Sequence, residues 1–340
     1  MKKIIGITVS VVIALAAYLG YGYYQKVFRP NTALDSDFEL FIPRGAQVED
    51  VIDSLSSNGV LKDVSGFKWV LGKKGYDQVR PGRYVLQPGM NNNEIVNKLR
   101  SGSQDPVRLV LHDISGVYEL AGKLAARLEP DSMTFLEMLT SSDDLKPYEV
   151  NPQTATVYFL PNTYELYWTT SPQQLMARMQ DEFYRFWTDE RLRKAKDMNL
   201  TPTEVVTLAS IVEKETTKAD EKDEVAGLYY NRIKKGMKLQ SDPTVIYAIN
   251  MDYPQRKITR VYFKDLTYSS PYNTYQNNGL PPGPIKIPAL STIDAVLNHK
   301  KHDYIFMVAD PERPGYHNFA TTLRGHNINR DKYINWLNRQ

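Results

Sequence analysis

The chain has no cysteine among its 340 residues. This absence excludes disulfides, cysteine-bound zinc, iron–sulfur clusters and thiol nucleophiles. Strong net charge is also missing, because 42 Lys and Arg against 39 Asp and Glu give +3 at pH 7. Nucleic-acid binding would need a basic stripe, so the mild excess predicts no nucleic-acid partner. No HExxH, Walker or Gly-x-Ser-x-Gly motif occurs, which removes the commonest signatures of metalloproteases, NTPases and α/β-hydrolases.

What is present is an ordinary globular composition with one unusual segment at its start. Hydrophobic residues make up 42% and charged residues 24%, which excludes a wholly disordered or multi-span membrane protein. The length predicts two or three domains.

The apolar run at residues 4–24 is long enough to cross roughly 30 Å of hydrocarbon. Lys2 and Lys3 precede it, which favours an N-terminus in the cytoplasm. We expect a cytoplasmic tail at 1–3, a single transmembrane helix at 4–24 and a body outside the cytoplasm. The alternative is a cleaved signal peptide. An interfacial aromatic belt is predicted at Tyr18, Tyr21, Tyr23 and Tyr24.

A strand–turn–helix pattern then occurs twice, after a linker predicted at residues 25–36. Alternating apolar residues predict the strands, and apolar residues three and four apart predict the helices. We therefore expect a small α+β module at residues 37–105. The apolar positions are Phe38, Leu40 and Ile42, then Val48, Val51, Ile52 and Leu55, and later Tyr84 and Leu86, then Ile95, Val96 and Leu99.

Residues 106–200 are predicted to be a mixed, mainly helical connecting region. Its aromatic, proline-containing stretch at 158–164 could form a cleft wall or simply pack in the core. The remaining residues, 201–340, are expected to be a mixed α+β domain. The predicted fold class is thus α+β, with a transmembrane helix, a small α+β module and a larger mixed α+β domain.

The most informative segment is the helix predicted to begin at Thr201. Thr201-Pro202-Thr203-Glu204 has the pattern of a capping box with proline at the first helical position. At about 100° per residue, Glu215 falls between Leu208 and Ile211 on the apolar face. Desolvation of a carboxylate raises its pKa, and such a group can act as a general acid. The alternative is a frayed helix end, with Glu215 solvated or paired with Lys214, Lys218 or Arg232.

Glu213 is the alternative acid on the same helix. It lies about 160° from Glu215 around the helix, so the two carboxylates cannot easily share one substrate bond. A conventional glycosidase would need its second carboxylate elsewhere.

Two later loops carry candidate substrate-binding residues. Gln240 and Asp242 could hydrogen-bond a ligand, although Ser-Asp-Pro is also ordinary turn chemistry. Tyr272 and Tyr275 could stack on a sugar ring and Asn273 could bind an acetamido group, in a loop that could equally be a rigid connector.

Near the C-terminus, His326 and Asn327 lie in a further polar segment. The histidines of this region follow no standard zinc spacing, so we expect neither metal nor cofactor. They are His299, His302, His317 and His326.

Taken together, these segments resemble the MltG/YceG-like family of membrane-anchored endolytic murein (peptidoglycan) transglycosylases. The resemblance covers nearly the whole chain and is specific in residues 205–330. The matching segments are Leu208-Ala209-Ser210-Ile211-Val212-Glu213-Lys214-Glu215-Thr216, Asn231-Arg232, Leu239-Gln240-Ser241-Asp242-Pro243-Thr244-Val245-Ile246-Tyr247, Ser270-Pro271-Tyr272-Asn273-Thr274-Tyr275, Gly279-Leu280-Pro281-Pro282-Gly283-Pro284-Ile285 and His326-Asn327.

The resemblance implies a bacterial cytoplasmic-membrane protein whose catalytic domain, residues 201–340, lies in the periplasm or faces the wall. It implies that the catalytic acid is Glu215. It implies that residues 37–105 are LysM-like, and that the enzyme cuts the MurNAc–GlcNAc bond within nascent strands. The products would carry 1,6-anhydro-MurNAc ends, and glycan elongation would stop. Partners would be peptidoglycan strands, with penicillin-binding proteins and other wall-synthesis enzymes. Two alternatives remain: a non-catalytic peptidoglycan-binding scaffold, or a glycan hydrolase that uses water.

Overall fold

The computed structural model describes residues 2–253, 255 and 258–339. Residue 1 of the predicted tail and residue 340 of the predicted catalytic domain lie outside them. The described residues form two compact units that mix helices with short strands, which confirms the α+β class.

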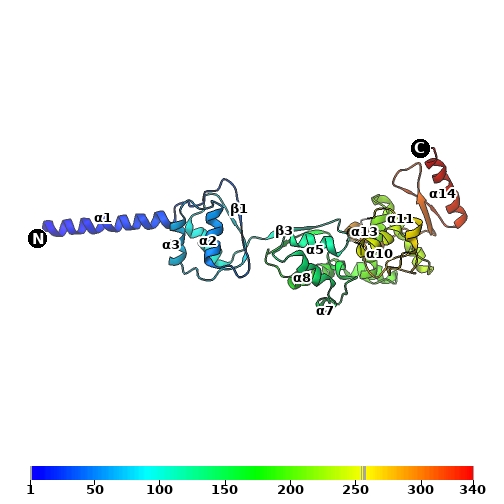
Figure 1. Ribbon diagram of the computed structural model, residues 1–340, viewed down its shortest axis with the longest axis horizontal. Coiled ribbons are helices and arrows are strands. Elements are labelled where there is room, and N and C mark those ends of the chain that lie inside the picture. The colour runs from blue at the N-terminus through cyan, green and yellow to red at the C-terminus, as the bar shows by residue number, and fades with distance from the viewer. Residues whose placement is uncertain (1, 254, 256–257, 340) are drawn as a thin grey trace. The chain divides into compact units, whose positions relative to one another are not determined.

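The first unit comprises residues 1–108, 127–129 and 165–170. Strands β1 and β2 pair antiparallel, with Leu40 opposite Tyr84. Both strands and helices α2 and α4 occur where the apolar spacing predicts them, whereas α3 was not predicted. The elements are α1 (Lys2–Val27), β1 (Phe38–Ile42), α2 (Val48–Ser57), α3 (Val64–Lys73), β2 (Gly82–Leu86) and α4 (Asn92–Ser101) (Figure 1).

Helix α1 continues from the apolar run into the module. Its segment Ile5–Val27 has 23 residues and a mean hydropathy of 1.9, so it is long and apolar enough to cross a membrane. Val27 is 3% exposed and belongs to the core of the module. The Asn92 side-chain amide donates to the Lys26 carbonyl (2.8 Å) and accepts a hydrogen bond from Asn31 (2.7 Å). The stretch predicted as a linker is therefore packed against the module.

The second unit comprises residues 109–126, 130–164 and 171–340. Strands β3 and β4 pair with each other, and their residues 107–108 and 165–166 belong to the first unit. Strands β5 and β6 form an antiparallel pair. The elements are β3 (Val107–Leu111), α5 (Val117–Ala125), α6 (Ser132–Thr140), α7 (Ser142–Leu145), η1 (Lys146–Tyr148), η2 (Ala155–Tyr158), β4 (Asn162–Leu166), α8 (Pro172–Phe186), α9 (Asp189–Asp197), α10 (Pro202–Glu215), η3 (Ala219–Glu221), α11 (Lys222–Lys234), α12 (Asp242–Asp252), η4 (Phe263–Thr267), α13 (Leu290–Leu297), β5 (Phe306–Ala309), β6 (His317–Ala320) and α14 (Leu323–Leu337) (Figure 1).

The aromatic stretch at 158–164 packs into this unit. Tyr158, Phe159 and Tyr164 are buried, and the Tyr164 hydroxyl donates to the Leu160 carbonyl (2.7 Å). Of the two roles left open for this stretch, burial favours core packing.

Helix α10 contacts α11, α12 and α13. The predicted capping box is confirmed, because the Thr201 backbone N–H donates to Glu204 (2.7 Å) and the Glu204 N–H donates to the Thr201 hydroxyl (3.2 Å). Residues 205–212 are all buried, including Thr207 and Ser210. The helix is thus enclosed on every side rather than along one stripe, and only its last turn leaves the core.

A glycine lets α11 approach the chain segment at 300–302. A Cβ atom at Gly227 would lie 2.4 Å from the Lys300 carbonyl oxygen and 2.8 Å from His302 Nε2. The absence of a side chain at residue 227 therefore allows the close packing of α11 against residues 300–302. This packing fixes the position of α11 and so the direction in which Tyr229 points.

We predict that Gly227→Ala lowers the free energy of unfolding by about 1–3 kcal/mol, because backbone must shift to admit the methyl group. The matched control is Gly122→Ala on α5, where no atom lies within 4 Å. There the higher helix propensity of alanine should raise stability by about 0.5–1 kcal/mol. Urea unfolding measures both changes, and equal effects at the two sites would contradict the packing argument.

Candidate active site

Glu215 is the last residue of α10, at the point where the helix leaves the core. Its Oε1 atom accepts hydrogen bonds from the Tyr229 hydroxyl (2.7 Å) and the Ser241 hydroxyl (2.5 Å). Both donors converge on one oxygen, and Oε2 accepts no hydrogen bond from the described residues. One oxygen of the half-buried carboxyl is held while the other is left for a ligand.

The pKa of Glu215 is raised above its ordinary value of 4.5. Burial is the largest cause, and the charge of Asp242 adds to the rise. The hydrogen bonds from Ser241 and Tyr229, together with His317, lower the pKa by less than burial raises it. The net direction favours the protonated acid, as the helical spacing predicts.

The alternative that Glu215 is neutralised by a neighbouring cation is wrong within the described residues, where Glu215 forms no ion pair. Lys214 is exposed, and the Lys218 Nζ atom lies 5.1 Å from the Tyr316 ring centroid. Arg232 is buried and donates to the carbonyls of Ile305 (2.7 Å) and Leu239.

Glu213 has the opposite environment. Its Oε2 accepts from the Lys222 ammonium (2.8 Å) and from the Thr292 hydroxyl. Burial raises the pKa of Glu213, but these hydrogen bonds and the positive charges of Lys222 and Lys286 lower it by more, so the net pKa is below its ordinary value. Glu213 shares no partner with Glu215 and is held as an ionised, structural carboxylate.

The turn before α12 presents Ser241 to Glu215. Ser241 occupies the N-cap position of α12, yet its hydroxyl does not cap the helix and donates to Glu215 instead. Gln240 has a φ of 51°, in the left-handed region that non-glycine residues rarely adopt. Backbone hydrogen bonds fix this turn, from Gln240 N–H to the Thr274 carbonyl (3.1 Å) and from Ser241 N–H to the Thr274 hydroxyl (3.0 Å).

The predicted residues Asp242 and Tyr275 are brought together beside Glu215. The Tyr275 hydroxyl donates to Asp242 Oδ1 (2.6 Å). Burial and this hydrogen bond raise the pKa of Tyr275, and the charges of Asp242 and Glu215 act in the same direction. Asp242 and Gln240 are exposed, so both can meet a ligand next to the acid.

Asn273 and Tyr272 have different surroundings. Asn273 is 0% exposed, and its amide donates to the carbonyls of Leu266 (3.1 Å) and Tyr268 (2.7 Å). This placement shapes the loop and leaves the amide no free donor. The ring centroid of Tyr272 lies 4.8 Å from that of Tyr247 on α12.

His326 and Asn327 lie on α14, and no described contact links them to Glu215. His326 stacks on Phe306 with ring centroids 5.3 Å apart, and burial lowers the pKa of His326. Among the described residues, no group of three or more His, Asp or Glu could hold a metal ion.

A cavity of about 790 Å³ adjoins the start of α12. Pro243 directly follows Asp242, and the cavity wall continues along the same helix. Its mixture of aromatic, aliphatic and charged groups suits an amphipathic polymer. The lining includes Tyr118, Glu119, Lys214, Pro243, Ile246 and Tyr247.

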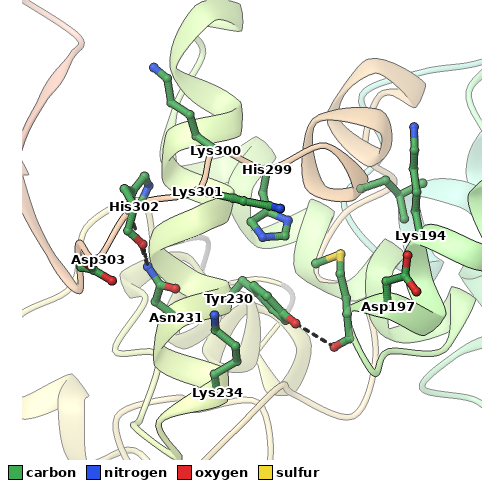
Figure 2. Close-up of a pocket in the computed structure, with 12 residues that line it drawn as sticks. Lys194, Asp197, Tyr230, Asn231, Lys234, His299, Lys300, Lys301, His302 and Asp303 are labelled. Atoms are coloured by element: carbon green, nitrogen blue, oxygen red, sulfur yellow. Dashed lines mark hydrogen bonds between the residues drawn. The ribbon is translucent and has the colours of Figure 1, made fainter.

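A second cavity of about 600 Å³ is basic and lies beside another face of α11. Figure 2 shows Tyr230 and Lys234 lining it, with the Tyr230 hydroxyl donating to the Met198 carbonyl (3.2 Å). Glu215 and its two hydrogen-bond donors do not line this cavity. Consecutive residues Tyr229 and Tyr230 therefore face different surroundings.

Sequence reasoning did not single out Tyr229, Ser241 or the pair formed by His317 and Glu221. Glu221 is 4% exposed and accepts from the His317 backbone N–H (2.6 Å), with its second oxygen 3.0 Å from His317 Nδ1. Ser241 had a usable signal, because it lies between the two polar residues chosen in its turn. Tyr229 had only its apolar helical spacing, which does not reveal where a hydroxyl points.

The sequence and the fold are similar to those of known proteins. The model of the YceG-like family matches residues 40–332. The crystal structure of a YceG-like protein from Listeria monocytogenes aligns with a TM-score of 0.55 and 28% sequence identity, over 87% of this chain and 99% of that chain.

Relatives from Bacillus subtilis and Streptococcus pneumoniae carry the name endolytic murein transglycosylase. The one from Bacillus subtilis is 29% identical over 315 residues, which covers 87% of this chain and 85% of the relative. The one from Streptococcus pneumoniae strain D39 is 27% identical over 368 residues, covering 97% of this chain. This chain spans 65% of that longer relative, just under two thirds.

The raised pKa of Glu215 predicts a pH-dependent stability. The stability that this group contributes is fully present below 4.5 and is lost as the pH rises through the folded-state pKa, because the unfolded chain releases the proton first. Between pH 4.5 and the folded-state pKa of Glu215, the free energy of unfolding should fall less steeply with pH in Glu215→Gln than in the wild type. Urea unfolding at a series of pH values measures both slopes.

Glu213→Gln is the matched control, and its effect on the pH dependence of the free energy of unfolding should have the opposite sign. The pKa of Glu213 is lowered, so its contribution is present above 4.5 and is lost as the pH falls through the folded-state pKa. If the Glu215→Gln and wild-type curves run parallel at every pH, the raised pKa is wrong.

Proposed function

The chain belongs to the YceG-like family, and we propose that it is an endolytic lytic transglycosylase that cleaves murein glycan strands. The observation that carries the proposal is the Glu215 carboxyl. Its pKa is raised by burial, and its Oε2 atom accepts no hydrogen bond from the part of the chain that the structure describes. A protonated acid in this arrangement can give its proton to the oxygen of a glycosidic bond.

In the proposed reaction, Oε2 of Glu215 protonates the leaving oxygen between N-acetylmuramic acid and N-acetylglucosamine. Positive charge develops at the muramoyl anomeric carbon, and the acetamido oxygen of the same sugar stabilises it. Ionised Glu215 then removes the proton from the C6 hydroxyl of that sugar, which closes onto the anomeric carbon. The product end is 1,6-anhydro-N-acetylmuramic acid, and the carboxyl regains its proton without consuming water.

This mechanism uses one enzyme carboxylate. Glu213 is held by Lys222 and Thr292 on another side of α10, which supports leaving it out of the chemistry. Substrate-assisted glycosidases are known exceptions to the two-carboxylate rule. In the ionised state, the hydroxyls of Tyr229 and Ser241 stabilise the new negative charge on Glu215.

We assign substrate positioning to groups around the acid. Gln240 and Asp242 are exposed beside Ser241, and Tyr275 holds Asp242. The strand would continue along the cavity at α12, where Tyr118 and Tyr247 line the wall and would offer rings to sugars. Tyr272 would support the ring of Tyr247, 4.8 Å away between centroids. Asn273 would act indirectly, by holding the loop, and His326 with Asn327 would contact more distant sugars.

The rest of the chain follows the same proposal. Helix α1 would anchor the protein in the bacterial cytoplasmic membrane with its N-terminus inside, and residues 37–105 would be a LysM-like glycan-binding module. Residues 201–340 would form the catalytic domain. Cutting nascent strands would end their elongation, which would place the enzyme beside penicillin-binding proteins.

Replacing Glu215 with Gln should preserve folding and reduce the release of anhydro-ended fragments by about a hundred- to ten-thousand-fold, since the variant has no proton to donate. Purified protein is incubated with murein, and the soluble fragments are identified by mass spectrometry.

Glu213→Gln is the control, matched in chemistry and two residues away, and should retain activity per folded molecule. If Glu215→Gln keeps its activity and Glu213→Gln loses it, the catalytic acid is Glu213 and the assignment to Glu215 is wrong. Absence of fragments from the wild type would favour a scaffold, and fragments heavier by one water would indicate a hydrolase.

Tyr229→Phe should shift the alkaline limb of kcat/KM to higher pH. The Tyr229 hydrogen bond lowers the pKa of Glu215, so its loss raises that pKa and keeps the acid protonated further into alkaline solution. Tyr230→Phe removes the next hydroxyl, which donates to Met198, and should leave the limb in place. A downward shift in Tyr229→Phe would refute the assigned role of the hydroxyl.

A further inference from the structure

The end of helix α1 packs on α3. The rings of Tyr23 and Trp69 meet edge to face, with centroids 5.9 Å apart. The Lys26 Nζ atom lies 5.3 Å and the Lys73 Nζ atom 5.7 Å from the Trp69 ring centroid. Trp69 is thus enclosed by an aromatic ring of α1 and two ammonium groups.

If α1 crosses a membrane, its contact with Trp69 determines how close α3 lies to the membrane surface. The apolar segment Ile5–Val27 has 23 residues, which at about 1.5 Å each slightly exceeds a hydrocarbon core of roughly 30 Å. Tyr23 therefore reaches the headgroup level, and Trp69 lies beside it. Tryptophan and tyrosine prefer that level, because one side of the ring system is apolar and the other can meet water.

The exposed face of α3 carries positive charge and no negative charge. Val64–Lys73 contains Lys68 and Lys73, both exposed, and no acidic residue. Neither lysine forms an ion pair with the described residues. Asp63 precedes the helix and caps it by accepting from the Gly66 N–H (2.8 Å).

The position of α3 beside the membrane helix is fixed. Val27 is in the core of the module, and Asn92 ties the Lys26 carbonyl to α4. The module therefore cannot swing away from the end of α1 without losing core contacts. We propose that the face of α3 formed by Lys68, Trp69 and Lys73 binds anionic phospholipid headgroups in the leaflet on the module's side. The proposal rests on α1 spanning the membrane.

The absence of cysteine makes single-site labelling possible. The full-length chain is placed in nanodiscs, with a nitroxide at Ser65→Cys on the exposed face of α3 or, as control, at Ser56→Cys on α2. Collision with a water-soluble nickel chelate is measured in zwitterionic discs and in discs with about one third phosphatidylglycerol. We expect several-fold lower accessibility at position 65 than at 56, with the larger protection in anionic discs.

The double variant Lys68→Ala, Lys73→Ala should lose the part of the protection that depends on anionic lipid, because each basic residue at such a surface contributes about fivefold to association. Arg193→Ala with Lys196→Ala on α9 removes the same charge elsewhere and should change nothing. The proposal is wrong if the nickel chelate reaches positions 65 and 56 equally well. It is also wrong if the protection of position 65 changes neither with lipid charge nor in the double variant.

A label at Ala14→Cys tests the premise separately. It should be reached by oxygen and not by the nickel chelate. If the chelate reaches it, α1 is not in the bilayer, and the membrane anchor fails independently of the catalytic assignment.

Discussion

Two hydroxyl groups meet at a single carboxyl oxygen, Oε1 of Glu215, and the packing of the second unit keeps them there. Tyr229 is aimed by α11, which can sit close to residues 300–302 because residue 227 has no side chain. Ser241 is aimed by a strained turn whose backbone is bonded to Thr274. Moving either support would alter the proton affinity of the acid.

Burial and hydrogen bonding act on this carboxyl in opposite directions. Burial penalises the charged form, whereas donors from Tyr229 and Ser241 stabilise it. A carboxyl that must first donate a proton and then accept one needs both influences, since an acid that never ionised could not complete the cycle. Both donors bind Oε1. In the proposed reaction the transferred proton would therefore belong to Oε2, and the protein would stabilise the charge without competing for the reacting atom.

Local sequence signals predicted much of the fold, because they are set by neighbours within one turn or one strand. The capping box at Thr201 and the strands around Leu40 and Tyr84 are of this kind. The apolar stripe selected Glu215, but residues 205–212 of α10 are buried on every side, so the stripe alone does not explain the environment of the Glu215 carboxyl. The environment of Glu215 depends on the hydroxyls of Tyr229 and Ser241, which lie 14 and 26 residues later in the chain. Asn273 shows the converse, since its polar amide is used entirely within its own loop.

The Glu213-Lys214-Glu215 segment shows how one helix end supplies two carboxylates with different tasks. Lys222 and Thr292 hold Glu213 in its charged form, which joins α10 to α11 and α13. Lys214 points outward to a cavity wall and leaves both carboxylates without an adjacent cation from their own helix. Glu213 supplies the ionic contact that orients the helix end. Glu215 forms no ion pair with any described residue, and its pKa stays raised. Pairing Glu215 as well would lower its pKa and remove the proton on which the proposed reaction depends.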